Sequence, residues 1–365
     1  MKGLSRSLIA VVGAAVVAVG LAACGDSNSG SSTEPVKLRL GYVTTAQHPY
    51  GLAVDAFKAD VEASSGGKLT IENTPNYTGG DSQLFDDVVD ATVEMAAIST
   101  AIWDTKGSNV FQALQAPFLI TNYGLSQEVL GGPIGDAMLA SENGPPKFGL
   151  VGLGILEGGL RKPLGREGAL KSPADFKGKK IRAPQSKVLS ATITALGAEP
   201  VALPVGDVFT ALQNGTVDGM EANLGLIYTN KYHEVAKFVT QDVNLWPFPA
   251  AVVINKAQWD KLSDEQKGWL RSAGEKLFPK TSVDAFVNPP PGALNFVQLL
   301  CDAGLTYAFA GDANRAALAK AAEAAYAELS ADSEVAGFIK QIQDAKAAAP
   351  PPAAPPALPA GCKKA

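Results

Sequence analysis

The stretch from Lys180 to Asn223, KIRAPQSKVLSATITALGAEPVALPVGDVFTALQNGTVDGMEAN, decides the fold of this chain. It opens on a short apolar and basic segment, residues 180–183, which is typical of a strand. Pro184 then turns the chain into a helix, and Gly197 stands where a left-handed C-terminal cap is needed. The apolar residues of this helix recur at the spacing i, i+4 and i+7, and they are Leu189, Ile193 and Leu196. The first half of the stretch therefore predicts a strand followed by an amphipathic helix.

The second half repeats this order. An apolar segment at 200–203 predicts a second strand, and Asp207 is placed to cap a second helix that ends at Asn214-Gly215. A third strand is predicted from Thr216 toward Asn223. Strands that alternate with helices in this way predict a parallel sheet with helices packed on it, and hence an α/β protein.

Arg182 is the residue of this stretch that points to function. In parallel sheets, ligands bind beyond the carboxyl ends of the strands, near the first turns of the following helices. Arg182 lies at such a strand end, directly before a helix. A guanidinium beside free helical N–H groups makes a site for a carboxylate. The alternative is that Arg182 only pairs with an acid at the surface.

Four motifs in this region resemble one family. They are KIRAPQSKV at 180–188, ALGAEPVALP at 195–204, DVFTALQNGTVDGMEAN at 207–223 and IYTNKYHEV at 227–235. The chain resembles, from about Leu38 to Leu329, the solute-binding proteins of TRAP transporters, which are DctP-like dicarboxylate-binding receptors. The resemblance implies a two-lobed periplasmic-binding-protein fold with a ligand cleft between the lobes. It also implies capture of a small organic acid, delivery to ion-driven membrane permease subunits, no cofactor and no catalysis.

The resemblance also implies roles for three residues. Arg182 matches the arginine that forms an ion pair with the substrate carboxylate. Arg161 matches an arginine that often faces the ligand, although its position on a predicted loop beside Lys162 leaves a solvated surface residue as an equal alternative. The family pattern Asp-Gly-x-Glu-Asn is displaced here, so that Ala222 stands at the usual asparagine position and Asn223 follows it. Asn223 is retained as a candidate ligand contact.

Other candidate contacts lie at strand ends. Strands are predicted at 37–43 and 96–99, and the resemblance makes Thr44 and Ser99, at the ends of these strands, candidate pocket walls, with turn hydroxyls as the alternative. Trp246 and Phe248 stand in a proline-punctuated segment before an apolar strand, and they either contact the ligand or belong to the core. The helix after the first strand is expected to bury a face made of Leu52, Ala53, Phe57 and Val61.

The predicted domain organisation has four parts. Residues 1–24 form a lipoprotein signal peptide, 25–36 a flexible tether, 37–346 the solute-binding domain and 347–365 an Ala/Pro-rich, disordered or extended tail. Within the domain, the first lobe is expected to take about 37–157 and 247–285, and the second about 158–246 and 286–346. The Pro289–Pro291 segment must break any helix there, which leaves the hinge undefined.

The N-terminal segment predicts export. Lys2 and Arg6 precede an apolar run that is shorter than the roughly 20 residues that a membrane span needs. Leu21-Ala22-Ala23-Cys24 resembles the lipobox of bacterial lipoproteins, so Cys24 is the expected lipidation site, with an ordinary secretory signal as the alternative. The exported chain is then lipid-anchored on the outer face of the cytoplasmic membrane or in the periplasm. Removal of Lys2 and Arg6 leaves 29 basic and 36 acidic residues, a net charge of −7, which offers no general case for nucleic-acid binding.

Two cysteines remain after Cys24. In an oxidising compartment, Cys301 and Cys362 form an even pair, which is either a disulfide that ties the tail to the second lobe or a buried thiol and a free tail thiol.

Catalysis finds little support in the sequence. The two histidines, His48 and His233, have no metal-ligand spacing, and neither a nucleophile elbow nor a P-loop is present. Two rival interpretations remain open, a secreted α/β hydrolase and a ligand-binding lipoprotein that serves a sensor or another transporter.

Overall fold

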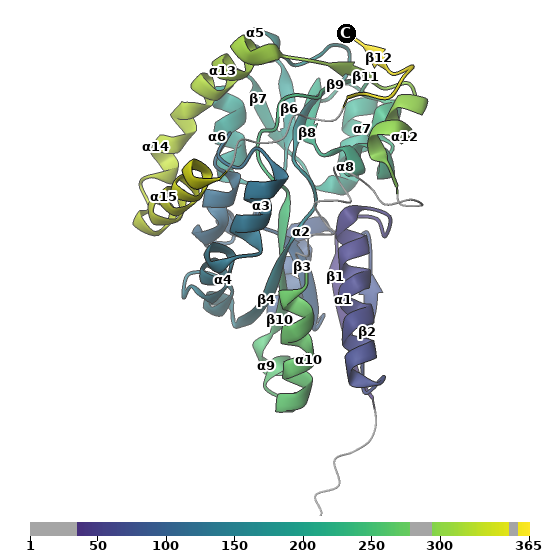
Figure 1. Cartoon of the computed structure of the whole chain (residues 1–365), viewed down its shortest axis with the longest axis vertical. Coiled ribbons are helices and arrows are strands. Elements are labelled where there is room, and N and C mark those ends of the chain that lie inside the picture. The colour runs from purple at the N-terminus through teal and green to yellow at the C-terminus, as the bar shows by residue number, and fades with distance from the viewer. Residues whose placement is uncertain (1–34, 278–293, 350–356) are drawn as a thin grey trace, which may run out of the picture. The chain divides into compact units, whose positions relative to one another are not determined.

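The computed structural model describes residues 35–277, 294–349 and 357–365 (Figure 1). The predicted signal peptide with Cys24, all but the end of the tether, and the Pro289–Pro291 break lie outside the described residues. The described part of the chain contains two β-sheets, each with helices packed against it. This arrangement confirms the α/β prediction.

The first sheet has five strands in the order β2-β1-β3-β10-β4. The strands are β1 (Val36–Tyr42), β2 (Leu69–Thr74), β3 (Met95–Ser99), β4 (Leu150–Glu157) and β10 (Pro249–Asn255). β1 is parallel to both β2 and β3, whereas β10 is antiparallel to β3 and β4. β10 thus enters the middle of a sheet whose other strands come from the first half of the chain.

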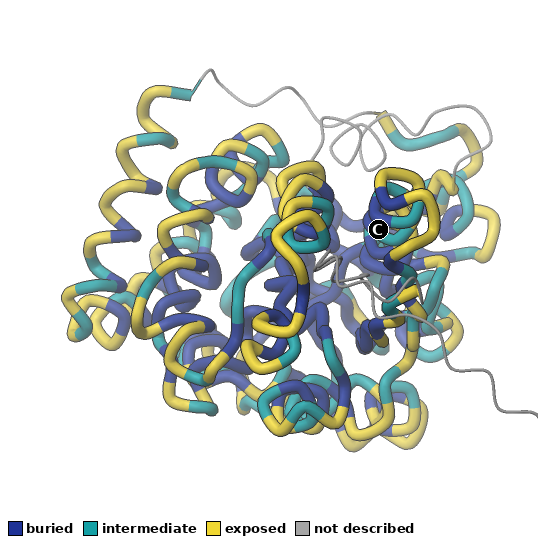
Figure 2. The backbone as a smooth tube through the Cα atoms, turned by 90° about the horizontal axis from the view of Figure 1, so that it is seen from below, coloured by how far each residue is buried: buried dark blue, intermediate teal, exposed yellow. Residues whose placement is uncertain are grey.

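Both faces of this sheet are covered. Along β3, Met95 and Ala97 belong to one core cluster and Ala96 and Ile98 to another, as the alternation of side chains along a strand requires. The helices α1 (Pro49–Ser65), α9 (Lys256–Trp259) and α10 (Asp264–Glu275) contribute to the first of these clusters. The second cluster receives α2 (Gly80–Val89), α3 (Tyr123–Leu130), α4 (Pro133–Ala140) and the 3₁₀ segments η1 (Ile102–Asp104) and η2 (Val110–Gln115). Buried residues, dark blue in Figure 2, follow the strands, and exposed residues lie along the outer sides of the helices.

The second sheet has seven strands in the order β12-β11-β9-β5-β8-β6-β7. The strands are β5 (Lys162–Gly165), β6 (Lys180–Ala183), β7 (Glu199–Ala202), β8 (Gly219–Ala222), β9 (Phe238–Thr240), β11 (Thr306–Ala308) and β12 (Lys363–Lys364). The remaining described α-helices are α5 (Pro173–Phe176), α6 (Lys187–Ala195), α7 (Val208–Gln213), α8 (Leu224–Thr229), α12 (Phe296–Asp302), α13 (Gly311–Ala322), α14 (Tyr326–Leu329) and α15 (Ser333–Ala348).

The stretch from Lys180 to Asn223 forms the elements that its sequence predicts. They follow one another as β6, α6, β7, α7 and β8, and β6 runs parallel to both β7 and β8. Gly197 has a φ of +96°, the left-handed conformation that the end of α6 was expected to need. Asp207 does stand before α7, but its side chain makes no capping hydrogen bond, because a 3₁₀ turn (Val205–Asp207) already leads into the helix.

Two of the chain segments that connect the sheets are bound to each other. Residues 158–161 lead from β4 to β5, and residues 241–248 lead from β9 to β10. The Arg161 N–H donates to the Trp246 carbonyl at 2.8 Å, and the Leu245 N–H donates to the Arg161 carbonyl at 2.9 Å. The buried Glu157 carboxylate accepts from the N–H groups of Gly159 (2.8 Å) and Phe248 (3.1 Å), so it joins both segments.

The lobe boundaries stay a prediction. The strands of the first sheet come from residues assigned to the first lobe, and β5 to β9 and β11 come from residues assigned to the second. Helix α15 was also assigned to the second lobe, but it packs against η2, α3 and α4, which come from the stretch assigned to the first.

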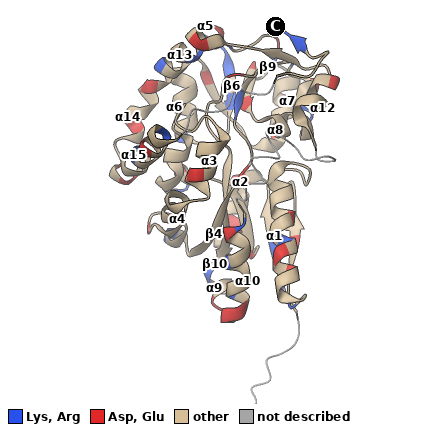
Figure 3. Cartoon of the chain, viewed as in Figure 1, with Lys and Arg blue, Asp and Glu red and all other residues tan. Residues whose placement is uncertain are grey.

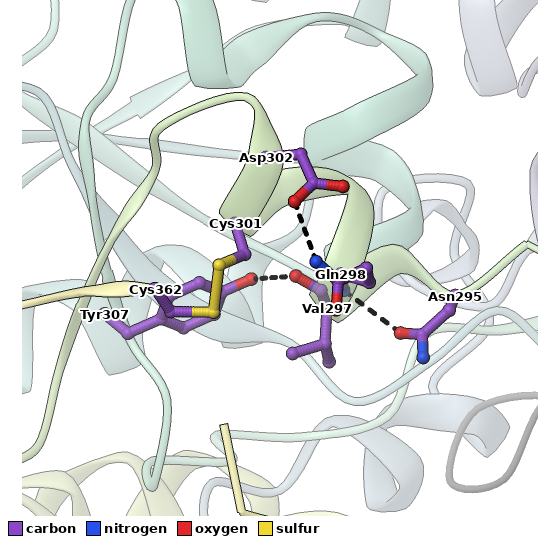
Figure 4. Close-up of a disulfide and its surroundings, with 7 residues drawn as sticks. All are labelled: Asn295, Val297, Gln298, Cys301, Asp302, Tyr307 and Cys362. Carbon is purple, nitrogen blue, oxygen red and sulfur yellow. Dashed lines mark hydrogen bonds between the residues drawn. A yellow bond between two sulfur atoms is a disulfide. The ribbon is translucent and has the colours of Figure 1, made fainter. Parts of the chain in front are cut away.

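The C-terminal segment differs from the expected tail. Helix α15 extends through Ala348, and residues 357–365 return to the second sheet, where β12 pairs in parallel with β11. Leu358 and Cys362 pack against the core of this sheet, so the tail does supply core-forming residues. A disulfide links Cys362 to Cys301 of α12, beside Tyr307 of β11 (Figure 4). The Ala/Pro-rich composition of the segment did not predict these contacts, because only one leucine and one cysteine make them.

Candidate functional site

Arg182 is a buried cation on β6 without a carboxylate partner. Its side chain is 4% exposed, and its Nε and Nη2 both donate to the Leu203 carbonyl oxygen, at 3.1 and 2.7 Å. Among the described residues, no carboxylate forms an ion pair with it. Burial lowers the pKa of Arg182 to about 10, so its charge is retained at neutral pH. Lys and Arg residues, including those of β6, are blue in Figure 3.

Arg161 lies inside the protein rather than on a solvated loop. It is 1% exposed and forms a buried ion pair with Glu221 of β8. Its Nη2 also donates to the Glu221 carbonyl oxygen at 2.7 Å, and its guanidinium lies 4.5 Å above the Phe248 ring. The surface alternative for Arg161 is therefore wrong, because its neighbours Glu221 and Phe248 come from distant parts of the chain.

The two arginines are close enough to affect each other. Burial and, after it, the positive charge of Arg182 lower the pKa of Arg161 to about 9. Arg161 Nη1 is buried without a hydrogen-bond partner among the described residues. Glu221 forms an ion pair with Arg161, whereas no described carboxylate forms one with Arg182.

Asn223 directs an unused donor into the same region. It is the N-cap of α8, and its Oδ1 accepts from the Leu226 N–H at 2.8 Å and from His48 Nε2 at 3.2 Å. Its Nδ2 is buried and has no partner in the described part of the chain. Asn223 also comes two residues after Glu221, to which Arg161 is bound.

The first sheet contributes Thr44, Ser99 and an acid that the sequence analysis missed. Thr44 follows β1, and its buried Oγ1 finds no partner among the described residues. Ser99 ends β3, and its N–H donates to Asp81 Oδ1 at 2.9 Å. Burial raises the pKa of Asp81 to about 6, against the opposing effects of the Ser99 N–H, Arg182 and Arg161. The charges of both arginines thus reach this acid from the second sheet.

The aromatic contact to the arginines comes from Phe248 and not from Trp246. Trp246 belongs to a core cluster with Ala101 and Leu245, although its buried Nε1 has no partner among the described residues. Phe248 lies under Arg161 and stacks on Tyr50 at 4.7 Å between ring centroids. The Tyr50 hydroxyl donates to the Phe248 carbonyl oxygen at 2.8 Å.

Four of the six candidate contacts share one property. Each carries a buried polar atom that has no hydrogen-bond partner among the described residues, and they are Thr44, Arg161, Asn223 and Trp246. Such atoms are costly in a folded protein unless a ligand or water completes them. Two of them, on Arg161 and Asn223, are donors, and Arg161 lies within the electrostatic reach of Arg182. This set of donors suits a carboxylate.

Sequence reasoning missed four residues of this region, which are His48, Tyr50, Asp81 and Glu221. His48 stands between the end of β1 and the start of α1, and Tyr50 lies in the first turn of α1, which is the kind of position that directed attention to Arg182. Glu221 gave no such signal, because it lies within a strand and its partner Arg161 is sixty residues away.

The comparisons with known proteins identify the family of the chain. The chain matches, over residues 40–332, the family model of bacterial extracellular solute-binding proteins, family 7 (DctP), and belongs to that family. It is 32% identical over 256 residues to the 2,3-diketo-L-gulonate-binding periplasmic protein YiaO of Escherichia coli K12, which covers 68% of this chain and 74% of the relative. It is 30% identical over 274 residues to the C4-dicarboxylate-binding periplasmic protein DctP of Rhodobacter capsulatus, which covers 73% of this chain and 78% of the relative.

Solved structures show the same fold. A TRAP periplasmic solute-binding protein from Bradyrhizobium sp. BTAi1, in complex with α/β-D-galacturonate, superposes with a TM-score of 0.75 at 28% identity, over 84% of this chain and 99% of that one. The chain is thus a two-lobed solute-binding receptor of the TRAP class, as the resemblance implied. Within the part of the chain that the structure describes, no helix has the length and apolar character to span a membrane.

Proposed function

We propose that this receptor captures a small organic acid by its carboxylate and delivers it to the membrane permease subunits of a TRAP transporter. Arg182 carries the proposal, because its buried guanidinium forms an ion pair with none of the described carboxylates. Arg161 Nη1 and Asn223 Nδ2 add donors to the same carboxylate, whereas Thr44 and Ser99 border the ligand from the first sheet. Trp246 is retained as a wall of the site. The role is binding without a chemical step, which the family of extracellular solute-binding proteins supports.

The acids named for the relatives define the ligands to try. They include a keto sugar acid, a uronic acid and C4 dicarboxylates. D-galacturonate, 2,3-diketo-L-gulonate and succinate therefore form the first panel, and an acid that raises the melting temperature of the wild type is taken into calorimetric titration.

Substitution of Arg182 tests the proposal. Loss of one partner of a buried charge pair costs about 2–5 kcal/mol, so Arg182→Ala should weaken binding by roughly 30-fold or more. Arg182→Lys should also bind poorly, because an ammonium group does not reproduce the planar two-point contact. The melting temperature without ligand should change little, since removal of an unpaired buried charge offsets the lost bonds to Leu203.

Arg166→Ala is the matched control. Arg166 pairs with the exposed Glu167 just beyond β5, and its loss should leave binding unchanged. If Arg182→Ala binds the acid as tightly as the wild type does, the carboxylate is not held by Arg182 and the proposal fails.

We also propose that Cys24 is lipidated after export, so that the receptor is tethered to the membrane by residues 25–36. The support is the sequence Leu21-Ala22-Ala23-Cys24 and the Ser/Gly-rich composition that follows it. Cys24 lies outside the described residues.

A further inference from the structure

His48 and Asn223 join elements of the two sheets at the site. Each is the N-cap of a helix, His48 of α1 and Asn223 of α8, and their side chains meet at 3.2 Å although 175 residues separate them. Gly225 shows how closely these elements approach. A Cβ at that position would lie 2.9 Å from Pro49 Cδ and 3.4 Å from His48 Cδ2.

The hydrogen bonds of His48 determine its tautomer. Nδ1 accepts from the Tyr50 N–H at 3.1 Å, so it carries no hydrogen in this arrangement. In a neutral ring Nε2 then carries the hydrogen and donates it to Asn223 Oδ1. Burial and, to a smaller extent, the nearby charge of Arg161 lower the pKa of His48 to about 3, against the opposing effect of the Asn223 hydrogen bond. The ring is therefore neutral at physiological pH.

The surroundings of His48 keep it in place. It meets Tyr50 and Phe248 edge-on, with centroid distances of 5.3 and 6.0 Å. Arg161 is the charged group that acts on the ring. No described carboxylate forms an ion pair with it that would favour a second proton.

The two bonds to Oδ1 also determine the orientation of the Asn223 amide. If the amide flipped, its NH₂ group would face the N–H of Leu226 and the N–H of His48, which are both donors. The observed orientation leaves Nδ2 buried, with its hydrogens unused by the described residues.

We propose that His48 is a positioning residue for ligand binding, which holds the Asn223 amide so that Nδ2 donates to the bound carboxylate. This rests on the proposed function, since it concerns the same ligand. His48 itself contacts Asn223 and not the acid. The alternative is that His48 serves only as the N-cap of α1.

Two substitutions separate these roles. His48→Asn keeps an acceptor for the Tyr50 N–H, and hence the cap of α1, but is too short to reach Asn223. His48→Gln places an amide donor near the position of Nε2, and its side chain is long enough to keep the hydrogen bond to Asn223. D-galacturonate and succinate serve as probes, and their dissociation constants are measured by calorimetric titration.

The expected results differ for the two roles. If His48 positions Asn223, His48→Asn weakens binding about tenfold, while His48→Gln stays within about threefold of the wild type. In an Asn223→Ala background, His48→Asn should cause no further loss, because the amide that it orients is gone. The proposal would be overturned if His48→Asn bound the probes as tightly as the wild type does. It would also be overturned if His48→Asn weakened binding as much in the Asn223→Ala background as in the wild type. His233→Asn, at the other histidine, is the control.

A ligand-independent measurement distinguishes this proposal from the function on which it rests. If the wild type binds neither probe nor 2,3-diketo-L-gulonate, the proposed ligand class is wrong. The positioning role is then judged from the ¹⁵N–¹H spectrum of the imidazoles, with His233→Asn used for assignment. A neutral His48 with hydrogen on Nε2 down to pH 5 supports the orienting contact. A ring that titrates near its ordinary pKa of about 6.5 shows that the contact does not form and overturns it.

Discussion

At the scale of single residues, the charge of the site depends on pH through Asp81. This acid accepts from the Ser99 N–H and lies within the electrostatic reach of Arg182 and Arg161. Burial outweighs these favourable effects and raises its pKa to about 6. Near neutral pH Asp81 is mostly ionised and opposes part of the charge that attracts a ligand carboxylate. In mildly acidic solution it becomes neutral.

The free energy of unfolding should depend on pH because of this titration. Because the pKa of Asp81 is higher in the folded protein than its ordinary value of 3.8, the folded state binds more protons between these two values. The free energy of unfolding should therefore rise as the pH falls through 6. Relative to Asp81→Asn, the wild type should gain about 2 kcal/mol between pH 7 and pH 4, measured by denaturant unfolding.

Other acids titrate in both proteins, so they cancel in this difference. Asp60→Asn, which removes an acid that pairs with Lys276 at the surface, controls for a general change of charge. A difference between wild type and Asp81→Asn that stays constant with pH would show that Asp81 is not desolvated.

The predictability of the site also varies residue by residue. Arg182 could be predicted as a site residue from the sequence, because a strand end that directly precedes a helix is a local pattern. Asn223 could be kept as a candidate only through the family motif. Glu221 and Phe248 could not be assigned, because their contacts to Arg161 arise from pairing between distant segments. His48 was considered only as a metal ligand, and its contact to Asn223 spans the two sheets.

At the scale of secondary-structure elements, α1 shows where periodicity misleads. The expected face included Leu52, yet Leu52 is 50% exposed. The buried positions are Tyr50, Val54, Phe57 and Val61. Tyr50 belongs inside because it stacks on Phe248, and this contact rotates the buried face away from Leu52. The helix was predictable, whereas its rotation about its axis required the partner.

The C-terminal strand gives the prediction that belongs to this scale. The bond from Cys301 to Cys362 closes a loop over a separation of 61 residues and holds β12 beside β11. Such a loop should stabilise the fold by about 4 kcal/mol through the entropy of the unfolded chain. Non-reducing peptide mapping of the exported protein should show one linked peptide, and the double variant Cys301→Ala, Cys362→Ser should lose this stability in denaturant unfolding.

Lys364→Ala is a matched control, because it alters β12 without touching the bond. Free thiols at both cysteines in protein exported by a native host would contradict the assignment. The hydrogen bond from the Tyr307 hydroxyl to the Val297 carbonyl, at 2.9 Å, would still join α12 to β11 (Figure 4).

At the scale of the whole molecule, the proposed lipidation of Cys24 would decide where the receptor works. Two acyl chains are needed for stable membrane attachment, since one chain gives only marginal binding. The wild type should therefore fractionate with membranes, and Cys24→Ala should appear in the soluble fraction without lipid. The measurement is fractionation followed by mass analysis of the N-terminal peptide.

Cys362→Ala provides the comparison, because it removes a cysteine but leaves Cys24 intact. It should remain with the membrane fraction. A fully soluble wild type whose N-terminal peptide carries no lipid mass would show that the segment is an ordinary secretory signal.

The position of β10 in the first sheet has a consequence for the order in which the chain can fold. β4 lies at the edge of that sheet with β10 as its neighbour, yet β10 follows β4 only after the strands β5 to β9 of the second sheet. During synthesis from the N-terminus, β4 therefore cannot pair with β10 until most of the chain has been made. Pairings of such long sequence separation form slowly. The first sheet therefore cannot be completed before the chain has been made as far as Asn255.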